Sequence, residues 1–148
     1  MGQLMRRNIL TYPAPPFNEG YDLICMHPDP RHKGNRVVKI QVKSRLATDS
    51  SGFYVHSRTL KAFDYLIVVV MNLGYHFRRG ADGRHGAGPS TLYTLPIREI
   101  RRRLVPGKRE KVLFGSNRRC LSKYEDDTGL EQIAKNLKIP YPVPPRLA

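Results

Sequence analysis

The sequence predicts an α/β fold with a mixed central β-sheet flanked by helices, and three of its segments lead to this prediction. Residues 21–45 contain two strand-like stretches separated by a polar turn, residues 64–72 form an apolar run rich in β-branched side chains, and residues 96–104 have a helical pattern. An apolar run without polar alternation is typical of a strand buried on both faces, at the centre of a mixed sheet with helices on either side. Together the segments favour a sheet covered by helical layers.

The N-terminal residues predict a short helix and then an irregular connection. In residues 2–9 the side chains of Leu4, Met5 and Ile9 are spaced for one face of a helix. Residues 11–20 (TYPAPPFNEG) contain three prolines. Because proline cannot continue a helix, we expect this segment to be a loop or a distorted edge strand.

Two strands with a polar turn between them follow. Residues 21–26 (YDLICM) and residues 36–45 (RVVKIQVKSR) have the composition of strands, and residues 27–35 (HPDPRHKGN) are polar and turn-forming. Two such strands joined by a short polar loop predict an antiparallel, hairpin-like pair.

The middle of the chain leads into the buried strand and out of it again. Residues 53–57 (FYVHS) predict a short strand and residues 57–63 (SRTLKAF) one helical turn, which lead into the apolar strand at 64–72 (DYLIVVVMN). Residues 74–90 are rich in Gly and Arg and have no periodicity. A connection of this length is expected to be functional or mobile.

The last elements are one strand and two helices. Residues 91–95 (TLYTL) predict the strand, and residues 96–104 (PIREIRRRL) predict a helix with proline at its first position. Residues 126–139 predict a short amphipathic helix with Asp127 or Thr128 as its N-cap.

Composition indicates one domain that binds a polyanion. The 148 residues fit a single domain, in which we expect a core at residues 1–104 and a basic C-terminal extension at residues 105–148 packed on it. The chain has 26 Lys and Arg against 12 Asp and Glu, a net charge of +14 and a pI near 10.2. A pI above about 9 is usual for a nucleic-acid-binding domain. A basic protein with no such role, or one that lies on acidic lipid, is the alternative, but no long basic amphipathic helix favours the lipid surface.

Other classes of protein are disfavoured. No apolar run approaches the roughly 18 residues of a membrane helix, and the first residues lack the apolar stretch of a secretory signal. Cys25 and Cys120 are the only cysteines, too few for a disulfide framework, and we interpret both as buried thiols. We therefore expect an intracellular, cytoplasmic protein with no membrane association.

A polar pair on one strand marks the candidate site. Side chains alternate along a strand, so Gln41 and Lys43 share one face while Ile40 and Val42 share the other. If the 21–26 strand pairs with this one, Asp22 comes within reach of both polar residues. A carboxylate and an amide oxygen are suitable ligands for a hard divalent cation, and a neighbouring lysine can orient or deprotonate a water or neutralise charge on a phosphate. This combination suits the cleavage of phosphodiester bonds.

At these residues the chain resembles the PD-(D/E)XK nuclease superfamily, whose fold is restriction-endonuclease-like. The resemblance rests on GYDLI with Asp22, on QVK at residues 41–43, on FDYLIVVV and on LYTLPIREIRR, in this order. It is to the small stand-alone members, akin to Holliday-junction resolvases and to an intron-homing branch that carries Gln in place of the acid. It implies a Mg²⁺- or Mn²⁺-dependent endonuclease acting on double-stranded or branched DNA. Asp22 would then be the metal-binding aspartate, Gln41 would occupy the acid position and Lys43 would be the motif lysine.

The chain differs from the superfamily pattern at Gln41, whose neutral side chain removes one anionic metal ligand. Glu19, three residues before Asp22, is the nearest carboxylate that can compensate. Many relatives carry a further metal-assisting glutamate in their first helix, and here Gln3 falls near that place. The alternative function is therefore a nuclease-fold DNA- or RNA-binding protein that cleaves weakly or not at all. An unrelated fold, with Asp22 and Lys43 as a surface ion pair, is a further alternative, as in a basic assembly protein of a ribonucleoprotein.

Basic side chains elsewhere are candidates for phosphate contacts, which contribute affinity but no sequence information. The candidates are Arg45, Arg78, Arg79, Arg84, Arg101, Arg102, Lys108, Arg109, Arg118 and Arg119. The helix arginines, including Arg103, could equally form a solvated face or contact a partner subunit. Small nucleases of this type commonly act as symmetric oligomers, so the resemblance implies a homo-oligomer.

Overall fold

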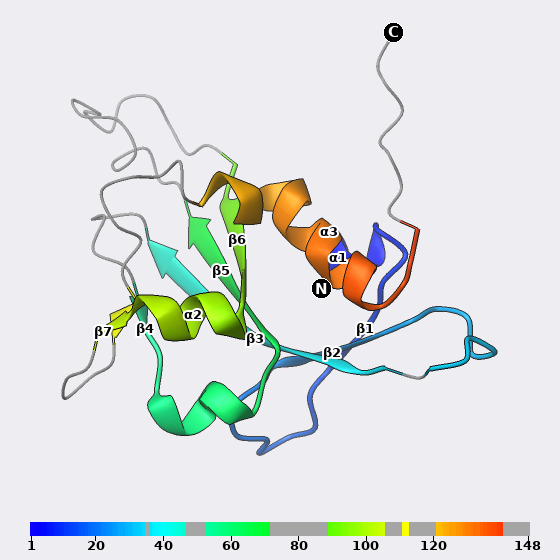
Figure 1. The fold of residues 1–148 in the computed structure, drawn as a ribbon, viewed down its shortest axis with the longest axis horizontal. Coiled ribbons are helices and arrows are strands. Elements are labelled where there is room, and N and C mark those ends of the chain that lie inside the picture. Colours follow the sequence, from blue (N-terminus) through cyan, green and yellow to red (C-terminus); the bar gives the residue numbers. More distant parts are fainter. Residues whose placement is uncertain (35, 47–52, 72–88, 106–110, 113–120, 141–148) are drawn as a thin grey trace, which may run out of the picture.

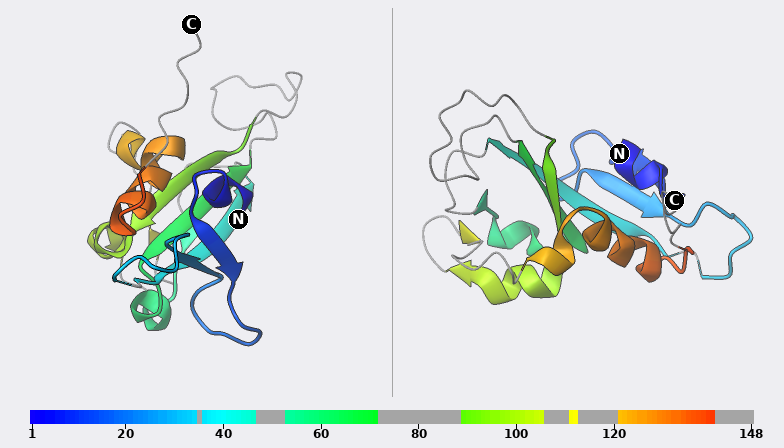
Figure 2. Two further views of the ribbon diagram at one scale, coloured as in Figure 1. Left: turned by 90° about the vertical axis from the view of Figure 1, so that its right-hand side faces the viewer. Right: turned by 90° about the horizontal axis from the view of Figure 1, so that it is seen from above.

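The computed structural model describes residues 1–34, 36–46, 53–71, 89–105, 111–112 and 121–140 as an α/β fold (Figure 1). Its main feature is a five-stranded mixed sheet with the strand order β1-β2-β3-β5-β6. The strands are β1 Leu10–Pro13, β2 Leu23–Met26, β3 Val38–Leu46, β5 Tyr65–Met71 and β6 Thr91–Pro96. They twist across the sheet as strands of L-residues do (Figure 2).

The first three strands form an antiparallel meander, and the chain then crosses over to a parallel strand. β1 pairs with β2 and β2 with β3 in antiparallel register. β3 and β5 pair in parallel, and the 3-10 helix η1 (Ser57–Lys61) lies in the connection between them. β6 returns antiparallel to β5. The mixed sheet and the antiparallel pair that the sequence predicts are therefore confirmed.

Helices cover the sheet, and a small second sheet lies beside it. The helical elements are α1 Gly2–Met5, α2 Ile97–Arg103, η3 Ser122–Tyr124 and α3 Asp126–Asn136. The second sheet has the strand order β4-β8-β7, with β4 at Phe53–Tyr54, β7 at Leu104–Val105 and β8 at Lys111–Val112. Among the helices in the described ranges, none has the length and apolarity needed to span a bilayer.

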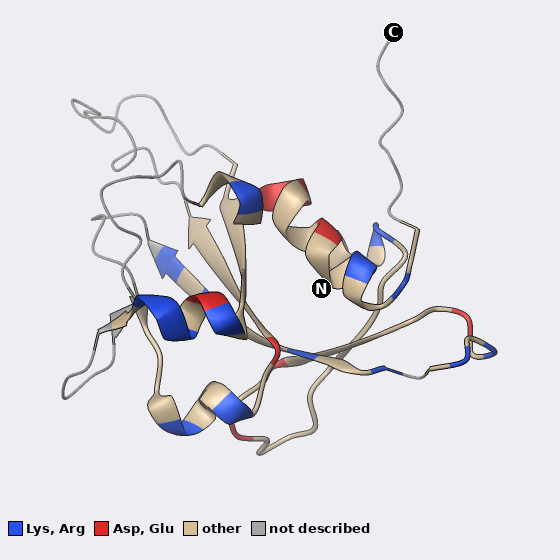
Figure 3. Ribbon diagram, in the orientation of Figure 1, with Lys and Arg blue, Asp and Glu red and all other residues tan. Residues whose placement is uncertain are grey.

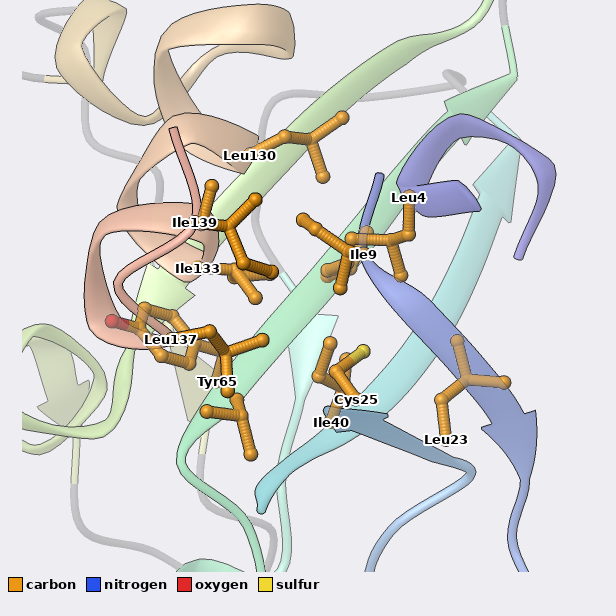
Figure 4. Packing of buried hydrophobic residues seen from close by; sticks show 13 residues of the cluster. Leu4, Ile9, Leu23, Cys25, Ile40, Tyr65, Leu130, Ile133, Leu137 and Ile139 are labelled. Atoms are coloured by element: carbon orange, nitrogen blue, oxygen red, sulfur yellow. The ribbon is translucent and has the colours of Figure 1, made fainter. Parts of the chain in front are cut away.

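β5 packs into the core on both faces, as its lack of polar alternation predicts, but it is the fourth strand of five and β3 occupies the centre of the sheet. Leu66, Val68 and Val70 point into one apolar cluster, which α2, η1 and β4 complete. Tyr65 and Ile67 point into a second cluster, which joins the sheet to α1 and α3 (Figure 4). Both faces of β5 thus pack against apolar side chains, and part of the C-terminal extension belongs to the same core.

Three elements differ from their sequence-based bounds. The predicted helix at residues 2–9 ends at Met5, and the chain turns at Asn8, which has a φ of 59°. The proline-rich segment contributes a true edge strand, β1, where proline is tolerated because an edge leaves backbone groups unpaired. The last helix begins at Asp126 and not after Asp127 or Thr128, and no side chain forms an N-cap hydrogen bond there. The excursion at residues 74–90 lies almost wholly outside the described residues.

Candidate active site

β3 carries Gln41 and Lys43 on the face of the sheet opposite to the one that packs beneath α1 and α3. Val38 and Ile40 are fully buried in the cluster beneath α1 and α3. The alternate residues, Gln41 and Lys43, stand opposite Leu66 and Val68 of β5, whose side chains belong to the other cluster. Gln41 and Lys43 are half-buried, so the strand presents a polar pair beside an apolar neighbour.

Asp22 lies directly beside this pair because the register of β2 and β3 places it there. Leu23 pairs with Ile40, and Asp22 directly precedes this pair, just outside the ladder, on the side of Gln41. The Asp22 N–H donates to the Ile40 carbonyl at 2.8 Å, and its carbonyl accepts from the Ala14 N–H at 2.8 Å. The carboxylate oxygen Oδ2 accepts a hydrogen bond from the N–H of Val42 at 2.6 Å. The carboxylate is therefore fixed against the residue that separates Gln41 from Lys43.

The side-chain oxygen of Gln41 has the property expected of a cation ligand. Oε1 is buried and has no hydrogen-bond partner among the described residues. An unsatisfied buried acceptor costs about 1–3 kcal/mol, so such an atom calls for a ligand or a functional explanation. Mg²⁺ binds through one or two carboxylates and keeps several waters or substrate oxygens. The Asp22 carboxylate and the unpartnered Gln41 oxygen fit this requirement.

Glu19 contributes less to the site than its position in the sequence suggests. Its side chain is exposed in the loop before β2. Within the described ranges, no three His, Cys, Asp or Glu side chains gather in a group that could hold a metal. Asp22 is therefore the one carboxylate that the hydrogen bonds of the described residues hold beside the polar pair.

Asp64 has a different role at the start of β5, although it also binds β3. Its N–H donates to the Lys39 carbonyl at 2.8 Å, and its Oδ2 accepts from the Lys39 N–H at 2.9 Å. Its carbonyl accepts from the Ile97 N–H at 2.9 Å. Asp64 thus joins β3, β5 and α2 through backbone groups, and sequence reasoning did not identify this role.

The predicted phosphate-binding residues are only partly described. Arg45 is half-buried on β3, on the same face as Lys43. Arg101 is exposed and donates to the Leu60 carbonyl at 3.5 Å. Arg102, on α2, is exposed. The remaining candidates lie outside the described residues. They are Arg78, Arg79, Arg84, Lys108, Arg109, Arg118 and Arg119.

A buried carboxylate, which sequence reasoning missed, holds the arginines at the end of α2. Glu99 Oε1 accepts from Arg102 Nη2 at 2.7 Å and from Arg103 Nε at 2.6 Å, and Oε2 accepts from the Tyr124 hydroxyl at 3.3 Å. Burial alone would raise the pKa of Glu99, but the two guanidinium groups lower it overall. The Arg103 side chain is 14% exposed and that of Arg102 is 67% exposed. Arg103 is therefore part of a structural ion pair and not of a phosphate-binding face, whereas Arg102 keeps a solvent-facing surface.

The distribution of charge gives the site a basic setting. Figure 3 shows Lys and Arg on η1, along α2 and on β3, around the start of β2.

Comparisons with protein-family models, with curated proteins and with solved structures give no match to this chain. The site geometry and the charge are accordingly what a functional proposal has to rest on.

Proposed function

We propose that this protein is a metal-dependent endonuclease that cleaves DNA phosphodiester bonds at Asp22, Gln41 and Lys43. The observation that carries the proposal is the hydrogen bond from the Val42 N–H to Asp22 Oδ2, because it brings a carboxylate to the centre of the QVK segment. The segments that resemble the PD-(D/E)XK nucleases occupy β2, β3, β5 and β6, which are neighbours in one sheet. Their contiguity supports a restriction-endonuclease-like fold.

Each of the residues has a defined task in this proposal. Asp22 and Gln41 would hold Mg²⁺ or Mn²⁺ through their side-chain oxygens, and Glu19 is available from the adjoining loop. The chemistry that the cation supplies when bound is polarisation of the scissile phosphate. Lys43, on the same face as Gln41, orients the attacking water and offsets the negative charge that develops on the phosphate. The backbone bonds of Asp22 hold its carboxylate in place before DNA arrives, which lowers the cost of organising the site.

Substrate recognition in this proposal is mainly electrostatic. The net charge of +14 attracts the DNA backbone, and Arg45, Arg101 and Arg102 are the described members of the set proposed to contact phosphates. Binding of this kind weakens steeply as salt is added, since each neutralised phosphate releases counterions. A homo-oligomer that spans two strands is part of the same proposal.

A second candidate is a DNA- or RNA-binding protein of the same fold that does not cleave. The observation that favours it is that no second Asp or Glu joins Asp22 in a metal-binding group within the described part of the chain. This candidate predicts salt-dependent binding, no divalent-metal stabilisation and no product. A DNA-cleavage assay with a divalent metal ion therefore distinguishes the two candidates.

The test is cleavage of supercoiled plasmid and of four-way branched DNA with Mg²⁺ or Mn²⁺, with Asp22→Asn and Asp64→Asn compared. Both substitutions remove one charge and leave an oxygen for the β3 N–H, so Asp64→Asn is a matched control. We expect the wild type and Asp64→Asn to cut at similar rates and Asp22→Asn to lose cleavage while it still binds DNA in EDTA. Thermal unfolding of each variant checks that the fold is intact. Equal cleavage by wild type and Asp22→Asn would refute the assignment, and binding without cleavage by the wild type would favour the second candidate.

A further inference from the structure

The loop between β1 and β2 presents a phenylalanine to solvent just before Asp22. The Phe17 side chain is 103% exposed, whereas the other exposed large apolar side chains in the described residues lie between 40% and 53%. An apolar ring in this position contributes nothing to the core. A single exposed apolar side chain is common on protein surfaces, so the exposure of Phe17 acquires meaning only together with its backbone and its surroundings.

The backbone at Phe17 is also unfavourable for phenylalanine. The Asn18 N–H donates to the Pro15 carbonyl at 3.2 Å, which closes a turn with Pro16 and Phe17 at its centre. Phe17 has a φ of 62°, and a positive φ at the third position of such a turn normally selects glycine or asparagine. A side chain there costs free energy relative to glycine. Neither packing nor backbone preference therefore explains why this residue is phenylalanine.

The loop is held in place, so the ring has a defined position relative to the candidate site. The Ala14 N–H to Asp22 carbonyl bond closes its base, and Asn18 Nδ2 donates to the Tyr21 carbonyl at 2.7 Å. Gly20, with a φ of 108°, packs so closely on η1 that a Cβ would lie 2.5 Å from the Ala62 Cβ. The loop projects beyond the sheet from this anchored base (Figure 2).

The surface beside the loop is basic. Gly20 lies against Thr59 and Ala62 of the η1 segment, and the neighbouring residues Arg58 and Lys61 are exposed. Figure 3 shows blue, basic segments on η1. An exposed aromatic ring on a loop whose base packs against a segment with two exposed cations, in a chain of net charge +14, suits a base with its flanking phosphates. An apolar protein surface would gain nothing from the two cations.

We propose that Phe17 stacks on an unpaired nucleobase of the DNA substrate while Arg58 and Lys61 contact the phosphates on either side of it. The inference rests on the proposed function for the identity of the polyanion. It adds a preference for DNA with unpaired bases, as at a branch point or a single-stranded end, next to the site of cleavage. Stacking on a ring tolerates any base, so the preference is for structure and not for sequence.

The test is fluorescence anisotropy in EDTA with a labelled single strand, longer than the roughly 4–16 nucleotides that one such module covers, and with the matching duplex. Phe17→Gly is the informative variant, because glycine accepts the positive φ and removes the ring. We expect the Tm of Phe17→Gly to be unchanged or about 2–4 °C higher. We expect its Kd for the single strand to rise about 5- to 150-fold, the equivalent of roughly 1–3 kcal/mol for one stacked base, with a smaller rise for the duplex.

Matched variants define the other outcomes. Tyr12→Ala removes a 50% exposed ring from β1 and should leave binding unchanged, whereas Phe17→Trp should bind at least as tightly as wild type. Arg58→Gln and Lys61→Gln should weaken binding to both DNA forms and lower its salt dependence. Wild-type affinity in Phe17→Gly overturns the proposal, and so does an equal loss on the single strand and the duplex. Loss of self-association without loss of DNA binding overturns it too, since Phe17 would then be a subunit contact. No arm uses metal or cleavage, so failure of the proposed function leaves a different pattern.

Discussion

Replacing Gln41 by Glu supplies the acid that the PD-(D/E)XK resemblance calls for, and its effect can be worked out from the end of the β2–β3 ladder. Because Leu23 pairs with Ile40 and Asp22 Oδ2 accepts from the Val42 N–H, a new carboxylate at position 41 lies next to that of Asp22. Side chains that neighbour one another across an antiparallel pair have Cβ atoms about 4.5–8 Å apart, the shorter value when they are directly opposite. Two carboxylates at roughly 5 Å repel by about 1–3 kcal/mol, depending on how well solvent screens them. Asp22 is exposed, so the lower end of this range applies.

Without metal, Gln41→Glu should therefore be less stable than wild type at neutral pH by about 1 kcal/mol, which is roughly 2–4 °C in Tm for a domain of this size. A divalent cation between the two carboxylates reverses the repulsion. Each tenfold gain in metal affinity adds about 1.4 kcal/mol of stability at saturating metal. We expect millimolar Mg²⁺ to raise the Tm of Gln41→Glu clearly more than that of wild type, and single-turnover DNA cleavage to become faster.

The assay is thermal unfolding in EDTA and in increasing Mg²⁺, with Gln3→Glu as the matched control. The resemblance puts Gln3 near a metal-assisting acid, but the structure places it on α1, which packs on the face of the sheet opposite to Gln41. Gln3 is exposed and its Oε1 accepts from Arg7 Nη1 at 2.9 Å, so the same change there adds a charge on the other side of the sheet. If Gln41→Glu unfolds at the wild-type temperature in EDTA and gains no more from Mg²⁺ than Gln3→Glu does, the proximity of positions 22 and 41 is refuted.

Two further predictions concern buried groups outside the site. Glu99→Gln leaves the largely buried Arg103 without its charge partner. Breaking a buried ion pair lowers the free energy of unfolding by about 3–5 kcal/mol. Here the expected loss is roughly 2–3 kcal/mol, because the glutamine oxygen still accepts a hydrogen bond and Arg102 is exposed to solvent. Because the pKa of Glu99 is lowered on folding, its contribution is complete above the unfolded-state pKa of about 4.3 and is lost as pH falls through the folded value. Urea unfolding of both forms at pH 7 and below pH ~4 should thus show a difference that shrinks in acid; a constant difference would contradict the pairing. Burial raises the pKa of the Cys25 thiol to about 11, against the opposing effect of a hydrogen bond with Thr11, so in a Cys120→Ser background Cys25 should resist alkylation at pH 8 until the protein unfolds. Rapid alkylation of the folded protein would show that Cys25 is accessible.

The strands could be predicted from the sequence wherever burial decides whether polar and apolar residues alternate. The lack of polar residues in β5 identified a strand covered on both faces, but not its place in the sheet, where β3 is the central strand and β5 lies next to the edge strand β6. The alternation in β3 identified which side chains share a face, and the short polar turn identified its antiparallel neighbour. These features depend on residues close in sequence.

The start of the last helix was not predictable, because a long-range contact decides it. The Asp126 carboxylate accepts from the Leu92 N–H of β6 at 2.8 Å, and Asp126 has a φ of 40°. This bond fixes Asp126 to the sheet and lets the helix begin there, so the capping pattern at Thr128 is not used. No local pattern contains the partner of Asp126.

The sequence alone suggested that Asp22 and Gln41 lie on adjoining segments, but it could not supply the contact that holds Asp22 there. Spacing suggested Asp22, Gln41 and Lys43, whereas the bond from Val42 that fixes Asp22 depends on the exact strand register. The spacing of Glu99 from Arg102 and Arg103 is readable as helix pairs, but its burial is not. The exposure of Phe17 is equally hidden, since an aromatic residue in a proline-rich loop is as compatible with packing as with binding.

The single-turnover rate of branched-DNA cleavage at saturating protein, in Mg²⁺, tests the proposed catalytic site most directly when Lys43→Ala is compared with Lys39→Ala. Lys39 is the matched control: it lies on the same face of β3, about 13 Å along the strand, with its ammonium 5.0 Å from the centre of the Tyr21 ring. We predict that Lys43→Ala lowers the rate by about 10²- to 10⁴-fold, while Lys39→Ala stays within about threefold of wild type, well below the effect of losing a catalytic group. Equal rates for wild type and Lys43→Ala, or equal losses in the two variants, would contradict a catalytic site at Asp22, Gln41 and Lys43.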